Sequence, residues 1–227
     1  PLSYVRTNIV GTVNILEAAR KNDTELVVNT STSETYGSAL YTPIDELHPL
    51  QGQSPYSASK ISADKLAESY YNSFKTPVLT IRPFNTFGPR QSSRAVIPTI
   101  ISQLLSQGEL YLGDLSPIRD FTYVSDTVNG FICAAKHHKH IGEVINLGYG
   151  EASSIGETAK TIMKILGLEK EIHSENSRIR PENSEVLHLV SDNSKAKDLI
   201  GWEPEINFSD GLEKTIKFVS ENIDTFK

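Results

Sequence analysis

The stretch LVVNTSTSETYG, Leu26 to Gly37, passes from an apolar run into small hydroxyl residues that surround a single acid, Glu34. A short apolar run bounded by polar residues predicts a buried strand, here over residues 25–30, whose end opens into a loop. Ligands of α/β proteins bind outside the carboxyl ends of parallel strands. The stretch therefore marks a candidate site, in which Glu34 is either a turn residue or a base.

Helices and strands alternate around this stretch. Two helices and a second buried strand are predicted: residues 4–20, with Val5, Ile9, Val13 and Leu16 on one side, residues 54–74, which begin at the cap and first-turn proline of Ser54-Pro55, and residues 77–82. This alternation up to about residue 90 predicts an α/β fold whose parallel sheet is covered on both faces.

After about residue 90 the predicted elements are shorter and more mixed, which indicates a smaller second lobe. Helices are expected over 96–105, 124–136 with Ser125 as the cap, 154–166 and 210–222, and strands over 110–112, 119–124 and 143–148. RPFNTFGPRQ, residues 82–91, is expected to be a loop.

Composition excludes several classes of protein. The formal net charge is −6 and there is no basic stripe, which argues against a nucleic-acid partner. No run approaches the ~18 apolar residues of a membrane span, and there is no signal-peptide pattern. The single cysteine, Cys133, suits a reducing cytoplasm. KHHKH, residues 136–140, has no accompanying carboxylates or cysteines, so no metal site is expected.

The segment SPYSASK places Tyr56 and Lys60 four residues apart, on one face of a helix. An ammonium close to a phenol favours the phenolate and lowers the tyrosine pKa from about 10. Tyr56 is therefore a candidate base for a substrate hydroxyl. An ordinary solvated pair is the alternative.

Thr32 at the strand end, Tyr56 and Lys60 occur between TN-x-x-GT-x-x-x-LEAAR and RPFNTFGPRQ. With these segments in this order, the chain resembles the extended short-chain dehydrogenase/reductase family. The resemblance implies NAD as cofactor and a Rossmann-like doubly wound parallel sheet, of which only the C-terminal half is present. Residues 1–90 would belong to this domain with the catalytic residues, and 91–227 mostly to a smaller mixed substrate lobe, with 120–150 returning to the sheet.

The resemblance also implies roles for individual residues. Tyr56 would be the acid/base, Thr32 would hydrogen-bond the substrate O4, and Lys60 would bind the nicotinamide ribose. Thr30 and Arg90 would be further cofactor-binding residues.

The triplet Thr32-Ser33-Glu34 resembles that of nucleotide-sugar 4,6-dehydratases, in the form found in the GDP-mannose branch. There Glu34 would remove the C5 proton after oxidation at C4, and water would leave from C6. Ser33 replaces the aspartate of dTDP-glucose dehydratases, which leaves the acid for the departing oxygen unnamed. UDP-glucuronate decarboxylases share the triplet, and 4-epimerases share the scaffold. A non-catalytic nucleotide-sugar binding protein is an alternative of another class.

The longer strings TSTSETYG, PIDELHPLQGQSPYSASKISADKLAESYYNSF and IRPFNTFGPRQSSRAVIPTII resemble the GDP-N-acetylglucosamine 4,6-dehydratases of legionaminic acid biosynthesis. This implies a GDP- or UDP-linked N-acetylhexosamine as substrate. A diphosphate needs fixed cations and amide donors. The resemblance implies that Asn85 and Arg119 face the diphosphate and that Arg180 and Glu185 reach the nucleotide end. Arg94 is a further candidate for the diphosphate, and Leu110 and Leu112 are candidates to flank the base. Surface ion pairs and plain strand core are the alternatives for the arginines and leucines.

No G-x-x-G-x-x-G segment occurs, and residue 1 is Pro. The family binds NAD through such a turn after its first strand, so the resemblance implies roughly 90 further residues upstream, at about 30 per βαβ unit. We expect the 227 residues alone to bind NAD poorly and to be inactive. The helices over 4–20 and 54–74 would form a homodimer interface, or would only cover one face of the sheet.

Overall fold

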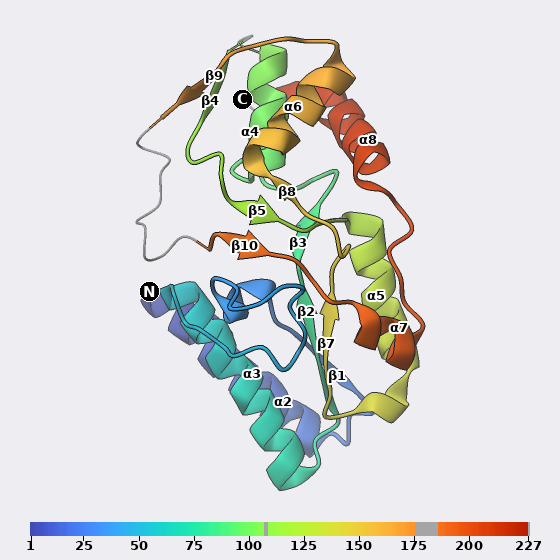
Figure 1. The fold of residues 1–227 in the computed structure, drawn as a ribbon. Coiled ribbons are helices and arrows are strands. Elements are labelled where there is room, and N and C mark those ends of the chain that lie inside the picture. The colour runs from blue at the N-terminus through green and yellow to red at the C-terminus, as the bar shows by residue number, and fades with distance from the viewer. Residues whose placement is uncertain (107–108, 176–185, 227) are drawn as a thin grey trace.

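The computed structural model describes residues 1–106, 109–175 and 186–226. One lobe is built on a parallel three-stranded sheet in the order β1-β2-β7. Its strands are β1 (Val27–Thr30), β2 (Val78–Pro83) and β7 (Val144–Leu147). The predicted α/β class is confirmed, because helices lie on both sides of this sheet (Figure 1).

The helices on one face come from the N-terminal half of the chain. They are α1 (Leu2–Tyr4), a π-helical segment (Val5–Val10), α2 (Gly11–Lys21) and α3 (Pro55–Phe74). Leu16, Ala67 and Val78 form the buried cluster on this face. The predicted helix over 4–20 is present. Of the four residues predicted to share one side, Leu16 is buried and Val5 is 43% exposed.

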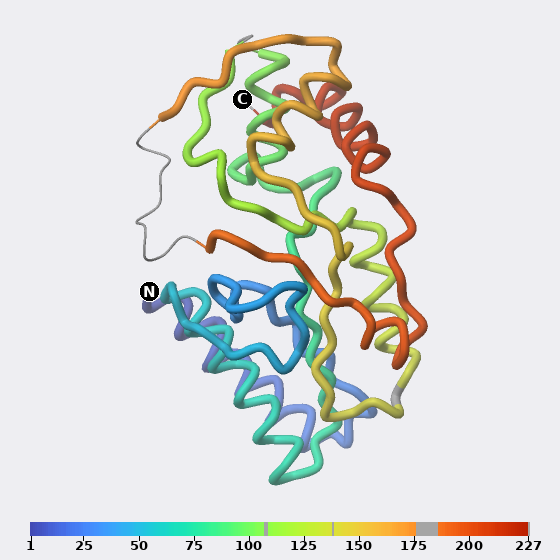
Figure 2. The backbone as a smooth tube through the Cα atoms, in the orientation of Figure 1, coloured from blue at the N-terminus to red at the C-terminus, as the bar shows by residue number. Residues whose placement is uncertain are grey.

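The opposite face of the sheet is covered by α5 (Val124–Lys136) and α7 (Ser194–Ile200). Its core contains Leu79, Ile81, Ile145 and Leu147 from the strands together with Trp202. Figure 2 shows the chain running from the second lobe down to α7 and back up to α8. This late return of the chain to the sheet was not predicted.

The second lobe packs three helices over short strand pairs. The helices are α4 (Val96–Ser106), α6 (Ile155–Leu166) and α8 (Phe208–Glu221). The strands are β3 (Asn85–Phe87) with β6 (Phe121–Tyr123), β4 (Leu110–Leu112) with β9 (Ile172–Ser174), and β5 (Ile118–Arg119) between β8 (Ser153–Ser154) and β10 (His188–Leu189). Short 3-10 turns cover Ser33–Tyr36, His138–His140 and Ile223–Thr225.

Two local predictions are wrong. The segment RPFNTFGPRQ contains the strand β3, which pairs in parallel with β6 some 35 residues later in the chain, Asn85 beside Phe121. Helix α5 begins after Tyr123, whose backbone is extended, and has no side-chain cap, so Ser125 is already inside the helix. Among the described residues, no helix combines the length and the apolar character that crossing a membrane requires.

Candidate active site

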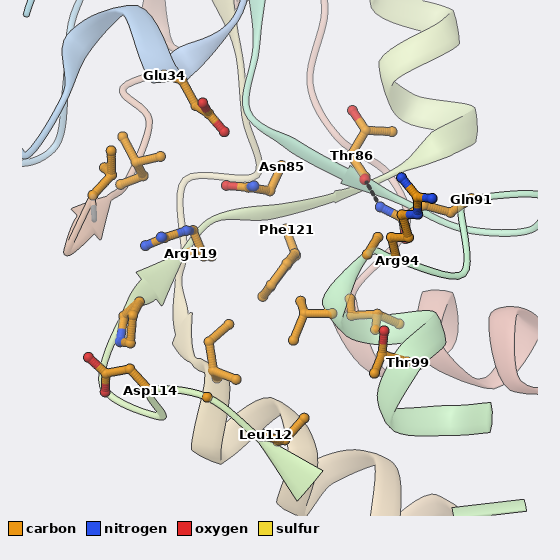
Figure 3. A pocket seen from close by; sticks show the side chains of 18 residues that line it. Glu34, Asn85, Thr86, Gln91, Arg94, Thr99, Leu112, Asp114, Arg119 and Phe121 are labelled. Atoms are coloured by element: carbon orange, nitrogen blue, oxygen red, sulfur yellow. Dashed lines mark hydrogen bonds between the residues drawn. The ribbon is translucent and has the colours of Figure 1, made fainter. Parts of the chain in front are cut away.

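The loop after β1 is shaped by its own hydroxyl groups. Thr32 is extended, and its Oγ1 accepts a hydrogen bond from the Glu34 backbone N–H at 3.3 Å. The Thr35 hydroxyl donates to the Thr32 carbonyl at 2.8 Å, within the 3-10 turn Ser33–Tyr36. The backbone of Glu34 thus makes the turn while its carboxylate lines the cavity beside it (Figure 3).

Helix α3 supplies the second half of the site. It begins with a capping box in which the Ser54 hydroxyl accepts from the Ser57 N–H and the Ser57 hydroxyl accepts from the Ser54 N–H. Tyr56 and Lys60 therefore lie in the first two turns, next to the end of β1. The Lys60 ammonium donates to the Thr30 carbonyl. Because an ammonium has three donors, this bond leaves donors for the hydroxyls of a bound ribose.

Tyr56 interacts with both Thr32 and Glu34. Burial, followed by the charge of Glu34, raises the pKa of Tyr56, while a side-chain hydrogen bond with Thr32 opposes the rise. Burial lowers the pKa of Lys60, against the opposing charge of Asp64. The prediction that Lys60 lowers the Tyr56 pKa is wrong for this structure, because Lys60 donates to Thr30 while burial and Glu34 disfavour the phenolate.

A cavity of about 450 Å³ opens next to Glu34 and lies between the lobes (Figure 3). Four of the predicted substrate-binding residues line it: Asn85 from β3, Arg94 from the loop before α4, Leu112 from β4 and Arg119 from β5. The cavity lining is mixed: Glu34, Asn85 and Arg119 are polar, Leu112, Ile155 and Phe121 are apolar, and Arg94 and Thr99 lie at the α4 side (Figure 3).

The remaining predicted residues lie elsewhere. Leu110 is fully buried in the core of the second lobe and does not line the cavity, whereas Leu112, in the same core, does. Ser33 is buried and does not line the cavity. Arg90 is exposed, with a left-handed backbone at φ 67°. Arg180 and Glu185 lie outside the described residues.

Four polar residues of the cavity were missed from the sequence: Thr86, Gln91, Thr99 and Asp114. The Gln91 amide donates to the Thr86 carbonyl at 2.9 Å, and its Oε1 is buried, as is Asn85 Oδ1. Neither oxygen has a hydrogen-bond partner within the part of the chain that the structure describes. Buried acceptors without partners are rare, so both atoms suit the donor groups of a polar ligand. Thr86 was missed because β3, the strand that carries it, was predicted to be a loop.

Comparisons with known proteins agree with this geometry. A family model described as GDP-mannose 4,6 dehydratase matches residues 1–215. Human dTDP-D-glucose 4,6-dehydratase is 31% identical over 241 residues, covering all of this chain and 67% of the human protein. The structure of dTDP-glucose 4,6-dehydratase from Bacillus anthracis in complex with NAD has a TM-score of 0.85 and 31% identity, and covers 96% of this chain and 69% of that one.

Epimerases are equally similar. The structure of UDP-glucuronic acid 4-epimerase from Bacillus cereus, with UDP-glucuronic acid and NAD, has a TM-score of 0.87 and 32% identity, and covers 96% of this chain and 68% of that one. The fold and its relatives define an extended short-chain dehydrogenase/reductase. Within that class, the chain belongs to the GDP-mannose 4,6-dehydratase family. It spans about two thirds of the length of the curated relatives it matches.

Proposed function

We propose that the full-length protein is an NAD-dependent nucleotide-sugar 4,6-dehydratase that makes a 4-keto-6-deoxy nucleotide sugar. The observation that carries this proposal is the position of Glu34, whose carboxylate borders the cavity and lies close enough to Tyr56 to raise its pKa. Oxidation at C4 needs only Thr32, Tyr56 and Lys60, whereas elimination also needs a base for C5, and Glu34 supplies it.

The cofactor would be held by the residues around the end of β1. Lys60 and Tyr56 offer hydroxyl-binding donors there, and Thr30 is a further candidate. Arg90, which is exposed in the loop after β3, is a candidate away from that strand end. Bound there, NAD would supply the redox chemistry, as the acceptor of the C4 hydride and its donor to C6. The residues of this chain would carry the proton transfers.

The proposed proton transfers balance in three stages. Tyr56 accepts the O4 proton, with Thr32 bonded to the same oxygen, as C4 becomes a ketone. The ketone acidifies the C5 hydrogen. Glu34 removes it as a proton and passes that proton to the C6 hydroxyl as the C6–O bond breaks, so that water leaves and a C5=C6 double bond remains. C5 then takes up a proton from solvent, relayed by Glu34, as hydride reaches C6, and Tyr56 releases the O4 proton to solvent. Ser33 is buried away from the cavity, so we assign it no proton transfer.

The proposed substrate is a GDP- or UDP-linked N-acetylhexosamine, as in the dehydratases of legionaminic acid biosynthesis. Arg119 and Arg94 would meet the diphosphate, and Leu112 would flank the base. The buried acceptor oxygens of Asn85 and Gln91 suit an acetamido N–H or sugar hydroxyls.

We also propose a cytoplasmic homodimer. Large apolar side chains are exposed along the N-terminal helices, including Leu2 (73%) and Ile15 (61%), and at Phe74 (53%) at the end of α3. Such exposed residues on neighbouring helices favour a second copy of the chain as partner. Light scattering after gel filtration of the full-length protein, compared with an Ile15→Glu variant, tests this.

The activity is tested by incubating the full-length protein with NAD and GDP-N-acetylglucosamine, UDP-N-acetylglucosamine or UDP-glucuronate. Product masses are then measured. Loss of one water from an N-acetylhexosamine supports the proposal. Release of CO₂ from UDP-glucuronate identifies a decarboxylase, an isomer of unchanged mass identifies an epimerase, and binding without turnover identifies a non-catalytic binding protein.

A further inference from the structure

A buried ion pair lies directly behind the active site. Asp64 on α3 and Arg82 on β2 have side chains that are 4% and 5% exposed. The Arg82 Nε and Nη2 atoms each lie 3.1 Å from Asp64 Oδ2. Buried ion pairs add little net stability, because desolvation offsets their attraction. The further hydrogen bonds of Asp64 and Arg82 indicate instead a role in positioning the residues that they contact.

Asp64 binds the start of the catalytic loop, Ser31 to Tyr36. The Ser31 hydroxyl donates to Asp64 Oδ2 at 2.7 Å, and the Asn29 amide donates to Oδ1 at 3.1 Å. Ser31 lies between Thr30, whose carbonyl accepts from Lys60, and Thr32, which bonds Tyr56.

Arg82 binds the other end of the same loop. Its Nη1 donates to Tyr36 Oη at 3.0 Å, and Tyr36 Oη in turn donates to Asn146 Oδ1 at 2.7 Å. The guanidinium carbon lies 4.9 Å from the centre of the Tyr36 ring. Tyr36 is fully buried and is the last residue of the 3-10 turn that contains Glu34.

The pair thus contacts both ends of the loop, and its Asp64 belongs to α3, the helix that carries the other catalytic groups. Tyr56, Lys60 and Asp64 are spaced by four residues and share one face of α3. We propose that the Asp64–Arg82 pair is a positioning device, which sets the distances from Thr32 and Glu34 to Tyr56 through Ser31 and Tyr36. This inference rests on the proposed function, because it assigns Glu34 a proton transfer.

Two variants test the proposal because each removes one link and leaves the ion pair intact: Ser31→Ala and Tyr36→Phe. Thr215→Val is the matched control, since Thr215 is a fully buried hydroxyl that donates to the Gly211 carbonyl inside α8. In the full-length protein we expect kcat to fall about 100-fold in each test variant, the loss that a misplacement of about 1 Å can cause. KM and the melting temperature should change no more than in the control.

The opposite pattern overturns the proposal: kcat within twofold of wild type, with the melting temperature alone reduced.

The wild-type product is determined first, so that failure of the proposed dehydratase function can be distinguished from failure of the positioning role. If the wild type epimerises at C4, the proposed dehydratase function fails. The positioning role is then still tested by the same kcat ratios, since Thr32 and Tyr56 act at C4 in either reaction.

Discussion

The carboxylate of Glu34 lies close enough to the phenol of Tyr56 to raise the pKa of that phenol, second only to the effect of burial. These residues come from different elements, the turn after β1 and the first turn of α3. The proposed bases for O4 and C5 therefore interact electrostatically, because the charge of Glu34 disfavours the phenolate of Tyr56.

A shift in the pH profile follows from this interaction. Tyr56 accepts a proton only as the phenolate, so we expect C4 oxidation to rise with pH toward its raised pKa. Glu34→Gln removes the repulsion, and the rising limb should move to lower pH. Rates of reduced-cofactor formation across pH measure this. A limb that stays in place shows that the two side chains do not interact in the working enzyme.

Removal of the Tyr56 hydroxyl should abolish C4 chemistry. We expect Tyr56→Phe to lower kcat by about 10²–10⁴-fold, the usual contribution of a general base. Tyr70→Phe is the control on the same helix, because its hydroxyl donates to Glu17 at 2.9 Å, away from the cavity. Steady-state rates of both variants are compared. Equal rates in Tyr56→Phe and Tyr70→Phe would show that Tyr56 is not the general base.

Asp120 gives the fold a pH dependence of its own. Burial raises its pKa to about 6 from the ordinary 3.8, despite hydrogen bonds from the backbone of Gly150, Tyr149 and Ser191. The folded state then binds this proton more tightly than the unfolded state does, so the stabilisation is complete below about pH 4 and is lost as the pH rises through 6. Denaturant unfolding of wild type and Asp120→Asn across this range measures the slope, which should be smaller in the variant.

Trp202 tests the unexpected return of the chain to the sheet lobe. It is 1% exposed, and its indole donates to the Asp126 carbonyl at 2.9 Å. Trp202→Ala should lower the free energy of unfolding by about 3–5 kcal/mol. Leu47→Ala, at a side chain that is 88% exposed, should change it by less than about 0.5 kcal/mol. Similar losses in the two would mean that Trp202 does not anchor this segment.

Local signals explain which parts of the fold were predictable. The span of α3 follows from the cap and proline at Ser54-Pro55, and Lys75 ends it in the left-handed conformation. Strand β3 was missed because it is only three residues long, Asn85–Phe87, and is preceded by Pro83 and followed by Gly88. It is stabilised by its pairing with β6. That pairing depends on contacts between segments distant in the chain, which no local pattern records.

In the site, too, local sequence patterns were predictive and contacts between distant segments were not. The spacing of Tyr56 and Lys60 was readable, but the direction of the Tyr56 pKa shift was not. That direction depends on the burial of the Tyr56 ring and on the charge of Glu34. It also depends on Lys60, which donates its hydrogen bond to the Thr30 carbonyl. The link from Asp64 to Arg82 likewise joins two segments whose relation appears only in the folded chain.

Glu34 is proposed to remove the C5 proton, the step that separates dehydration from simple oxidation at C4, and a comparison of wild type with Glu34→Gln tests this role. Full-length wild type and Glu34→Gln are each incubated with NAD and GDP-N-acetylglucosamine, and reduced cofactor and product mass are followed together. The wild type should lose one water per sugar, while the variant should still oxidise C4 but dehydrate at least about 100-fold more slowly. Dehydration at the wild-type rate in Glu34→Gln would contradict the account.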